Sequence, residues 1–267
     1  MVTKIERYKA YLIDWLYDWF KKNGDGCKAV VGVSGGKDSS VIAALCVEAL
    51  GKDRVLGVLM PNGIQSDIDD SYALCEHLGI EYVRLNINTA YSSILVGLDY
   101  NGITASTQTK VNLGPRLRMT TLYAVAQSVN GRVVGTSNLD ETMLGWCTRF
   151  GDNAADVEPI IKMHVDEVVE LGLALGLPEN LVKKAPADGL TAKTDEDNFG
   201  FTYAEFKEFF EKNSGISTTI DKQGLTEKEQ KMLDMFEKSE FKRKPIPEPK
   251  WYPCIFEDGY PYERGEK

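Results

Sequence analysis

Residues 28–50 read KAVVGVSGGKDSSVIAALCVEAL. The β-branched run KAVVGV predicts a buried strand, the two glycines that follow break it, and the apolar spacing of SSVIAALCVEAL predicts a helix. A glycine-rich turn between a buried strand and a helix often binds phosphate, because the first helical N–H groups are unpaired and the helix dipole is positive there. This position therefore predicts a nucleotide site.

The first half of the chain repeats this alternation of strands and helices. Further apolar strands are predicted at 54–60, 81–87 and 132–137, with helical stretches between them. Strands that are apolar throughout and alternate with helices predict a parallel sheet covered on both faces, so we expect a doubly wound α/β fold. Ligands of such folds lie at the carboxyl ends of the strands, where SGGKDSS, PNGIQSD and GTSNLDE all fall.

We expect one domain, residues 1–267, with three parts. Residues 1–150 form the nucleotide-binding α/β core. Residues 151–243 form a helical part, because the strands stop and amphipathic patterns such as TYAEFKEFFEK follow. Residues 244–267 form a tail rich in proline and aromatic residues, which is typical of extended, irregular structure.

The composition argues against several classes of protein. A net charge of -9 over 267 residues is unlike a general nucleic-acid binder, which needs a basic surface. No apolar run approaches the roughly 20 residues of a membrane span, and the charged N-terminal segment is unlike a signal peptide. The five cysteines form no CxxC pair. We therefore expect free thiols in a cytoplasmic protein without nucleic-acid or membrane partners.

The loop itself matches neither of the common phosphate-binding motifs. Asp38 stands where the Walker A motif has Ser or Thr, and Ser34 interrupts the glycine pair of the dinucleotide fingerprint. A carboxylate beside a pyrophosphate is repulsive unless a divalent cation lies between them, so Asp38 favours Mg²⁺. The structural alternative is a plain turn in which Asp38 or Ser39 caps the helix.

The segment VSGGKDSS resembles the SGGxDS pyrophosphate loop of the N-type ATP pyrophosphatases, which cleave ATP to AMP and pyrophosphate. The segments NLGPRLRMTTLY (112–123), GTSNLDETMLGWCTRFGDNAADVEPI (135–160) and KTDEDNFGFTY (193–203) are similar, in this order and spacing, to blocks of the NAD synthetase family. The resemblance spans about residues 28–243. It implies an adenine nucleotide alpha hydrolase-like fold with C-terminal helices.

The resemblance also implies a ligase of NAD biosynthesis. It implies amidation of deamido-NAD by ammonia, with ATP as co-substrate, in a homodimer, through an acyl-adenylate that yields NAD, AMP and pyrophosphate. Two carboxylates, Asp38 and Glu141, are implied to be catalytic and to hold Mg²⁺. The implied ATP contacts are Gly32, Val33, Ser34, Gly35, Gly36, Lys37, Asp38, Ser39, Thr136 and Lys162. The implied contacts to deamido-NAD are Arg116, Arg149, Asp156 and Lys242.

Several positions depart from the family's pattern. Val165 stands where the family has a lysine near ATP, and Lys162 could replace that lysine from three residues earlier on the same helix face. Ala187 replaces a Ser or Thr. Phe241 replaces the histidine of a His-Lys pair, and Arg149 stands where lysine is frequent. These departures affect nucleotide contacts more than they affect the class of reaction.

Structural and functional alternatives stay open on the sequence alone. Glu141 could be a first-turn glutamate favoured by the helix dipole, and Arg116 and Arg118 could be solvated helix charges. Another SGGxDS pyrophosphatase, either tRNA-modifying or GMP synthetase-like, or a non-catalytic nucleotide sensor would share the loop. About 27 residues precede the first predicted strand, too few for a glutaminase domain, so we expect ammonia to be the nitrogen source.

Overall fold

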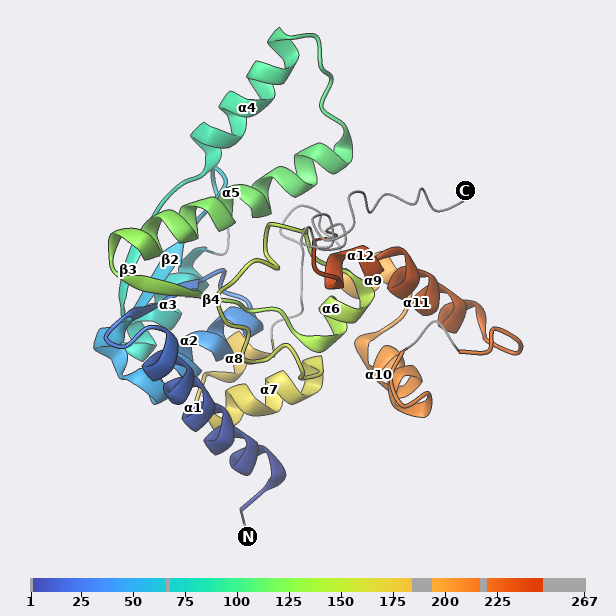
Figure 1. Ribbon diagram of the computed structural model, residues 1–267, viewed down its shortest axis with the longest axis horizontal. Coiled ribbons are helices and arrows are strands. Elements are labelled where there is room, and N and C mark those ends of the chain that lie inside the picture. Colours follow the sequence, from blue (N-terminus) through green and yellow to red (C-terminus); the bar gives the residue numbers. More distant parts are fainter. Residues whose placement is uncertain (1, 66–67, 184–193, 217–219, 247–267) are drawn as a thin grey trace, which may run out of the picture.

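The structure, a computed structural model, describes residues 2–65, 68–183, 194–216 and 220–246 (Figure 1). The strands are β1 (Lys28–Gly32), β2 (Val55–Leu59), β3 (Glu81–Arg84) and β4 (Gly131–Val134). The helices up to β4 are α1 (Lys4–Asn23), α2 (Lys37–Leu50), η1 (Lys52–Arg54), α3 (Ile68–Leu78), α4 (Asn88–Tyr100) and α5 (Thr107–Ser128). The later helices are α6 (Leu139–Leu144), α7 (Val165–Ala174), α8 (Glu179–Val182), α9 (Asp195–Phe199), α10 (Tyr203–Lys212), α11 (Glu227–Lys238) and α12 (Glu240–Arg243). Ala187 and the tail from residue 247 lie outside the described residues.

The four strands form one parallel sheet in the order β3-β2-β1-β4. Ala29 of β1 pairs with Val55 of β2 on one side and with Arg132 of β4 on the other. After β1 the chain adds β2 and β3 on one side of it, and β4 is later added on the other side. Ligands of such sheets bind at the carboxyl ends of the strands, where the strand order switches. The predicted parallel sheet is confirmed, and each strand ends somewhat earlier than the apolar pattern suggested.

Helices cover both faces of the sheet, because successive side chains of β1 point to opposite sides. Ala29 and Val31 pack with buried residues of α1, α2, α3 and α7, whereas Val30 packs with Ala126 of α5. The expected doubly wound α/β fold is confirmed. The edge strand β3 differs from expectation, since all four of its residues are exposed.

The helices after residue 150 are divided between two cores. Val168 and Leu171 of α7 belong to the core that covers the sheet, together with α1 and α2. Helices α9 to α11 have their own aromatic core, which includes Phe199 and Phe206 and also Leu144 of α6. Helix α6 follows β4 closely and packs against α10 and α11. It therefore joins the helical part to the carboxyl edge of the sheet.

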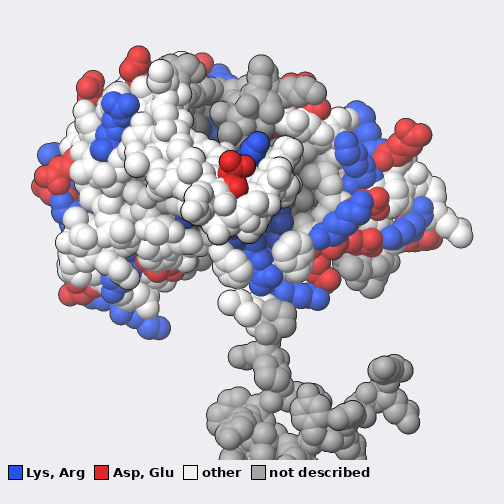
Figure 2. All heavy atoms as spheres, turned by 90° about the horizontal axis from the view of Figure 1, so that it is seen from above, with Lys and Arg blue, Asp and Glu red and all other residues white. Residues whose placement is uncertain are grey.

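Helix α4 projects from the body of the molecule, whereas the neighbouring α5 packs across β1 and β4 (Figure 1). Helix α4 has no buried residue, and its apolar side chains include Val96, which is 67% exposed, and Tyr100, which is 90% exposed. Seen from above, turned by 90° from Figure 1, the surface shows broad uncharged areas between scattered charged side chains (Figure 2). Within the described ranges, no helix combines the length and apolar character needed to cross a membrane.

Candidate active site

The glycine-rich loop joins β1 to α2, and its own small residues determine its shape. Gly35 has a φ of 78°, and a Cβ there would lie 3.0 Å from Asp70 Cβ, so glycine is required. Ser39 Oγ donates to Gly36 O at 3.1 Å and lies 3.1 Å from Ser34 Oγ. Among the described residues, no side chain caps α2. The alternative in which Asp38 or Ser39 caps this helix is therefore wrong, and the positive end of α2 faces the rim of the sheet.

The first two predicted loop residues, Gly32 and Val33, offer no side chain to a ligand. Val33 is 3% exposed and belongs to the core, while its N–H donates to Val58 O at 3.0 Å. Gly32 ends β1. Thr136, the predicted ATP contact on the neighbouring strand, follows the end of β4 by two residues. The loop and Thr136 therefore lie on adjacent strand ends at the same edge of the sheet.

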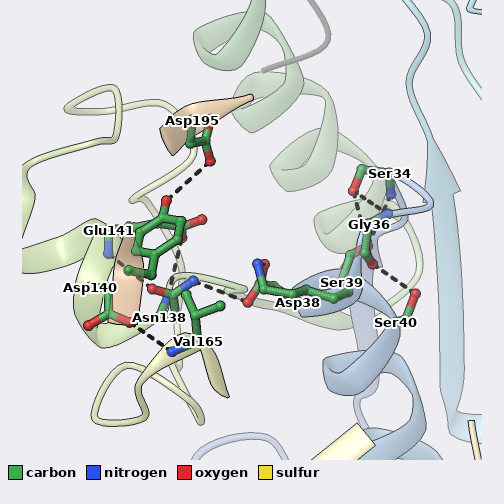
Figure 3. A network of polar contacts seen from close by, with 12 residues as sticks. Ser34, Gly36, Asp38, Ser39, Ser40, Asn138, Asp140, Glu141, Val165 and Asp195 are labelled. Atoms are coloured by element: carbon green, nitrogen blue, oxygen red, sulfur yellow. Dashed lines mark hydrogen bonds and ion pairs between the residues drawn. The ribbon is translucent and has the colours of Figure 1, made fainter. Parts of the chain in front are cut away.

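Asp38 and Glu141 converge from these two strand ends (Figure 3). Asn138 is the residue between them: its Nδ2 donates to Asp38 Oδ1 at 3.2 Å, and its Oδ1 accepts the Glu141 N–H at 3.0 Å. Glu141 in turn accepts the Asn138 N–H, which completes a capping box at the start of α6. The first-turn position considered for Glu141 is thus real, and it also directs this carboxylate toward Asp38.

The electrostatics show that these two carboxylates interact. Burial and the nearby charge of Asp38 raise the pKa of Glu141 well above its usual range. Lys37 is 4% exposed and donates to Asp38 Oδ2 at 2.8 Å. Burial disfavours its charge, but Asp38 and Glu141 outweigh that effect and raise the pKa of Lys37. The buried ammonium of Lys37 therefore interacts with the carboxylates of both Asp38 and Glu141.

This donor set fits Mg²⁺ bound together with a nucleotide. Mg²⁺ prefers oxygen ligands and commonly takes one or two carboxylates, with phosphate oxygens and waters completing its shell. Asp38 and Glu141 supply two such groups, and a cation between them would offset the burial and the repulsion by Asp38 that together raise the pKa of Glu141. No cluster of three or more His, Cys, Asp or Glu suited to a metal occurs among the residues that the structure describes.

Asp140, which precedes Glu141, fixes the start of α7 against α6. It is 1% exposed, lies 2.6 Å from His164 Nδ1 and accepts the Val165 N–H at 2.7 Å. His164 therefore has a structural role, because its ring nitrogen pairs with the buried Asp140. Lys162 is exposed and lies before α7, which begins at Val165. The prediction that Lys162 shares a helix face with Val165 is therefore wrong, because Lys162 lies outside the helix.

Asp195 connects the helical part to the same site, a role that sequence reasoning missed. Its carboxylate accepts Trp146 Nε1 at 3.0 Å and the Tyr203 hydroxyl at 3.1 Å. Burial, Glu141 and Asp195 raise the pKa of Tyr203. Figure 3 shows Asp195 above Glu141 and Asn138. No local pattern marks Asp195 as a site residue, whereas the N-x-x-E spacing of Asn138 and Glu141 is a recognisable capping signal.

The predicted substrate contacts comprise three cations and Asp156. Arg149 and Lys242 line a pocket of about 300 Å³ together with Tyr123, Phe150 and Lys244. Arg116 is exposed and reaches the edge of this region, where its Nε donates to Arg149 O at 3.4 Å. The structure therefore brings the three predicted cations of the substrate site together. Each of the three stays a predicted contact to the substrate.

Two neighbouring residues have clear structural roles. Lys242 Nζ donates to Gly145 O at 2.7 Å and to Cys147 O at 2.6 Å, so it holds the end of α6. Arg118 is not a solvated charge. Its Nε donates to Met60 O at 3.0 Å, and burial lowers its pKa.

Asp156 and Glu158 lie along the open edge of β4. The segment pairs with the strand, because Val134 and Val157 form a parallel bridge. Asp156 Oδ2 accepts the Val133 N–H at 2.8 Å, and its Oδ1 accepts the Tyr123 hydroxyl at 3.3 Å. Asp156 thus stands beside the pocket, with part of its carboxylate already used by the backbone.

The chain is similar to a known protein family over most of its length. The family model described as NAD synthase matches residues 8–246, which is most of the chain. The chain belongs to the NAD synthase family. An NH(3)-dependent NAD(+) synthetase from Methanosarcina mazei is 37% identical over 257 residues, covering 93% of this chain and 99% of its own. One from Methanococcoides burtonii is 42% identical over 200 residues, covering 73% of this chain and 74% of its own.

Solved structures of this family share the fold. An NMN synthetase from Francisella tularensis has a TM-score of 0.81 and 33% identity, covering 93% of this chain and all of its own. An NH3-dependent NAD synthetase from Campylobacter jejuni has a TM-score of 0.73 and 27% identity, covering 92% of this chain and 99% of its own. The predicted family and fold class are therefore confirmed. The tRNA-modifying and GMP synthetase-like alternatives receive no support.

Proposed function

We propose that this protein is a ligase that makes NAD from deamido-NAD, ammonia and ATP, and releases AMP and pyrophosphate. The observation that carries the proposal is the convergence of Asp38 and Glu141 beside the SGGKDSS loop, with Asn138 between them. The matched family model and the NH(3)-dependent NAD(+) synthetases among the relatives support the same reaction.

The reaction requires an activated carboxylate. A carboxylate oxygen of deamido-NAD attacks the α-phosphorus of ATP, the bond to the β-phosphate oxygen breaks, and pyrophosphate leaves. Ammonia then attacks the acyl carbon, loses a proton, and AMP departs. The first N–H groups of α2 and the ammonium of Lys37 favour the negative charge of the leaving pyrophosphate. Mg²⁺ held by Asp38 and Glu141 would supply Lewis-acid stabilisation of phosphate charge.

The same geometry supports a proposed location for the two nucleotides. The loop residues from Gly32 to Ser39 would hold ATP, with Thr136 on the adjacent strand end. Arg116, Arg149, Asp156 and Lys242 would hold the acidic substrate at the neighbouring pocket. Arg116 and Arg149 form no ion pair with any described carboxylate, and such cations suit a ligand that carries two phosphates and a carboxylate.

A homodimer through α4, α5 and β3 belongs to the same proposal. These elements expose apolar side chains that include Tyr82, Val96 and Tyr100, and exposed apolar side chains of this size are frequent at protein interfaces. We also place the protein in the cytoplasm. The described cysteines Cys27, Cys46, Cys75 and Cys147 are free thiols, as a reducing compartment requires.

The test is a product assay with purified protein, ATP and Mg²⁺. One arm supplies deamido-NAD with ammonium, a second replaces ammonium by glutamine, and a third replaces deamido-NAD by nicotinate mononucleotide, because a structural relative is an NMN synthetase. We expect equal amounts of NAD, AMP and pyrophosphate in the first arm and none with Asp38→Asn. Product from the mononucleotide alone would reassign the substrate, and ATP binding without any turnover would favour a nucleotide sensor.

A further inference from the structure

Arg149 is held by two aromatic rings from different parts of the chain. Its guanidinium carbon lies 5.0 Å from the ring centre of Phe150 and 5.6 Å from that of Phe241. Both distances fall within the range in which a guanidinium is attracted to an aromatic face. A planar guanidinium can stack on a ring in a way that the compact ammonium of lysine cannot.

The first ring is held in an unusual backbone conformation. Phe150 has a φ of 59°, a left-handed value that is uncommon for a bulky residue. Its N–H donates to Asn153 Oδ1 at 2.9 Å, which fixes the turn. Strained residues of this kind persist where the surrounding structure enforces them, and they concentrate at ligand sites. The conformation places the Phe150 ring against Arg149.

The second ring is anchored through the residues that follow it. Phe241 lies on α12, whose Lys242 donates to two carbonyls at the end of α6. Arg243 also donates to Met143 O at 2.9 Å. The backbone beside Phe241 is therefore fixed, although the Phe241 side chain itself packs little and the residue is 53% exposed.

The guanidinium held in this way lacks a negative partner. Arg149 is half-buried, and its Nη2 donates to Lys244 O at 3.3 Å. Within the described part of the chain, no carboxylate forms an ion pair with Arg149 or with Arg116. Both rings and the Lys244 carbonyl therefore orient a cation toward a pocket that Lys242 also lines. Arg149, Lys242 and Lys244 line this pocket, whereas none of its described lining residues is acidic, and this favours an anionic ligand.

We propose that Phe241 and Phe150 hold Arg149 as a stacked clamp for an anionic group of the substrate, and that Phe241 is a specificity-determining positioning residue. The group is a carboxylate or a phosphate, since a guanidinium fork pairs with either through two parallel hydrogen bonds. The inference rests on the proposed function, because deamido-NAD carries both groups. It also explains why two departures of the sequence, Arg149 and Phe241, lie in contact.

The test compares replacements of Phe241 in the full chain. Phe241→Leu keeps apolar bulk but removes the aromatic face, and Phe241→Trp enlarges that face. We expect Leu to raise the Kd of deamido-NAD about two- to fivefold and Trp to leave it equal or lower. Isothermal titration calorimetry measures these constants. The Kd of ATP and the Tm of each variant should stay unchanged, since Phe241 is half-exposed and remote from the SGGKDSS loop in sequence.

A double-mutant comparison shows whether Phe241 acts through Arg149. In an Arg149→Ala background, Phe241→Leu should have no further effect on deamido-NAD binding. An equal loss in both backgrounds, or no loss with Leu alone, would overturn the clamp. If the wild-type protein fails to bind deamido-NAD, both the proposed function and the clamp are refuted. If it binds normally and only the Phe241 variants disagree with expectation, the clamp alone fails.

NAD serves as the probe that separates the two anions, because it has the same diphosphate but an amide in place of the carboxylate. A Phe241→Leu loss confined to deamido-NAD identifies the carboxylate as the clamped group. An equal loss for NAD identifies a phosphate. Either result supports the clamp.

Discussion

Replacing Glu158 by glutamine should stabilise the ligand-free protein, and by an amount that depends on pH. Glu158 lies against the end of β4, where a Cβ on Gly135 would be 2.2 Å from its Cδ. Among the described residues, its carboxylate accepts only long hydrogen bonds from Ser137, at 3.3 Å from the N–H and 3.4 Å from the hydroxyl. Burial outweighs these bonds and raises the pKa of Glu158 from 4.5 to about 7.

The magnitude follows from linkage between proton binding and folding. Below the ordinary pKa of 4.5, Glu158 is protonated in both the folded and unfolded chain, so its ionisation does not affect stability. As the pH rises toward 7, the unfolded chain loses this proton while the folded protein keeps it, and stability falls. One pKa unit corresponds to about 1.4 kcal/mol, so the penalty reaches about 3 kcal/mol above pH 7. Glutamine has no charge and keeps the shape that Gly135 accommodates.

The assay is urea unfolding of wild type and Glu158→Gln at about pH 5 and about pH 8. The gain in free energy of unfolding should be about 1 kcal/mol at the lower pH and about 3 kcal/mol at the higher. At the higher pH, Tm should rise by roughly 6 °C or more. Glu76→Gln, at an exposed position on α3, is the matched control and should change little. An identical gain at both pH values would refute the assigned cause.

Three further predictions concern the site and the interface. Asn138→Asp should preserve the cap of α6 but place a third carboxylate beside Asp38 and Glu141. We expect kcat to fall at least about tenfold with little loss of Tm. An unchanged kcat at all Mg²⁺ concentrations would contradict the assigned role of Asn138. Arg116→Ala should raise the KM of deamido-NAD more than that of ATP, and steady-state kinetics showing equal increases would count against the substrate assignment. Val96→Lys, on the exposed face of α4, should shift the protein toward monomer in light scattering after size-exclusion chromatography. A dimer that persists would place the interface elsewhere.

Local chemistry made much of the candidate site predictable. The SGGKDSS loop is contiguous, and its glycines and its position after a β-branched strand are local properties, so its place at a strand end followed directly. Asp38 and Glu141 were predicted from the resemblance, and the structure brings them together. Lys162 shows where local reasoning failed: i,i+3 spacing presumes a continuous helix, and α7 begins only at Val165.

The sequence by itself determined the parallel α/β fold, the loop at its carboxyl edge and the family, because strand period, glycine placement and motif order are written along the chain. Only the tertiary structure decided how distant residues act on one another. It placed Asn138 on Asp38, Asp195 on Trp146 and Tyr203, and Phe241 on Arg149. Burial and the distance between charges set the pKa of Glu141, and both quantities arise only when separate segments pack together.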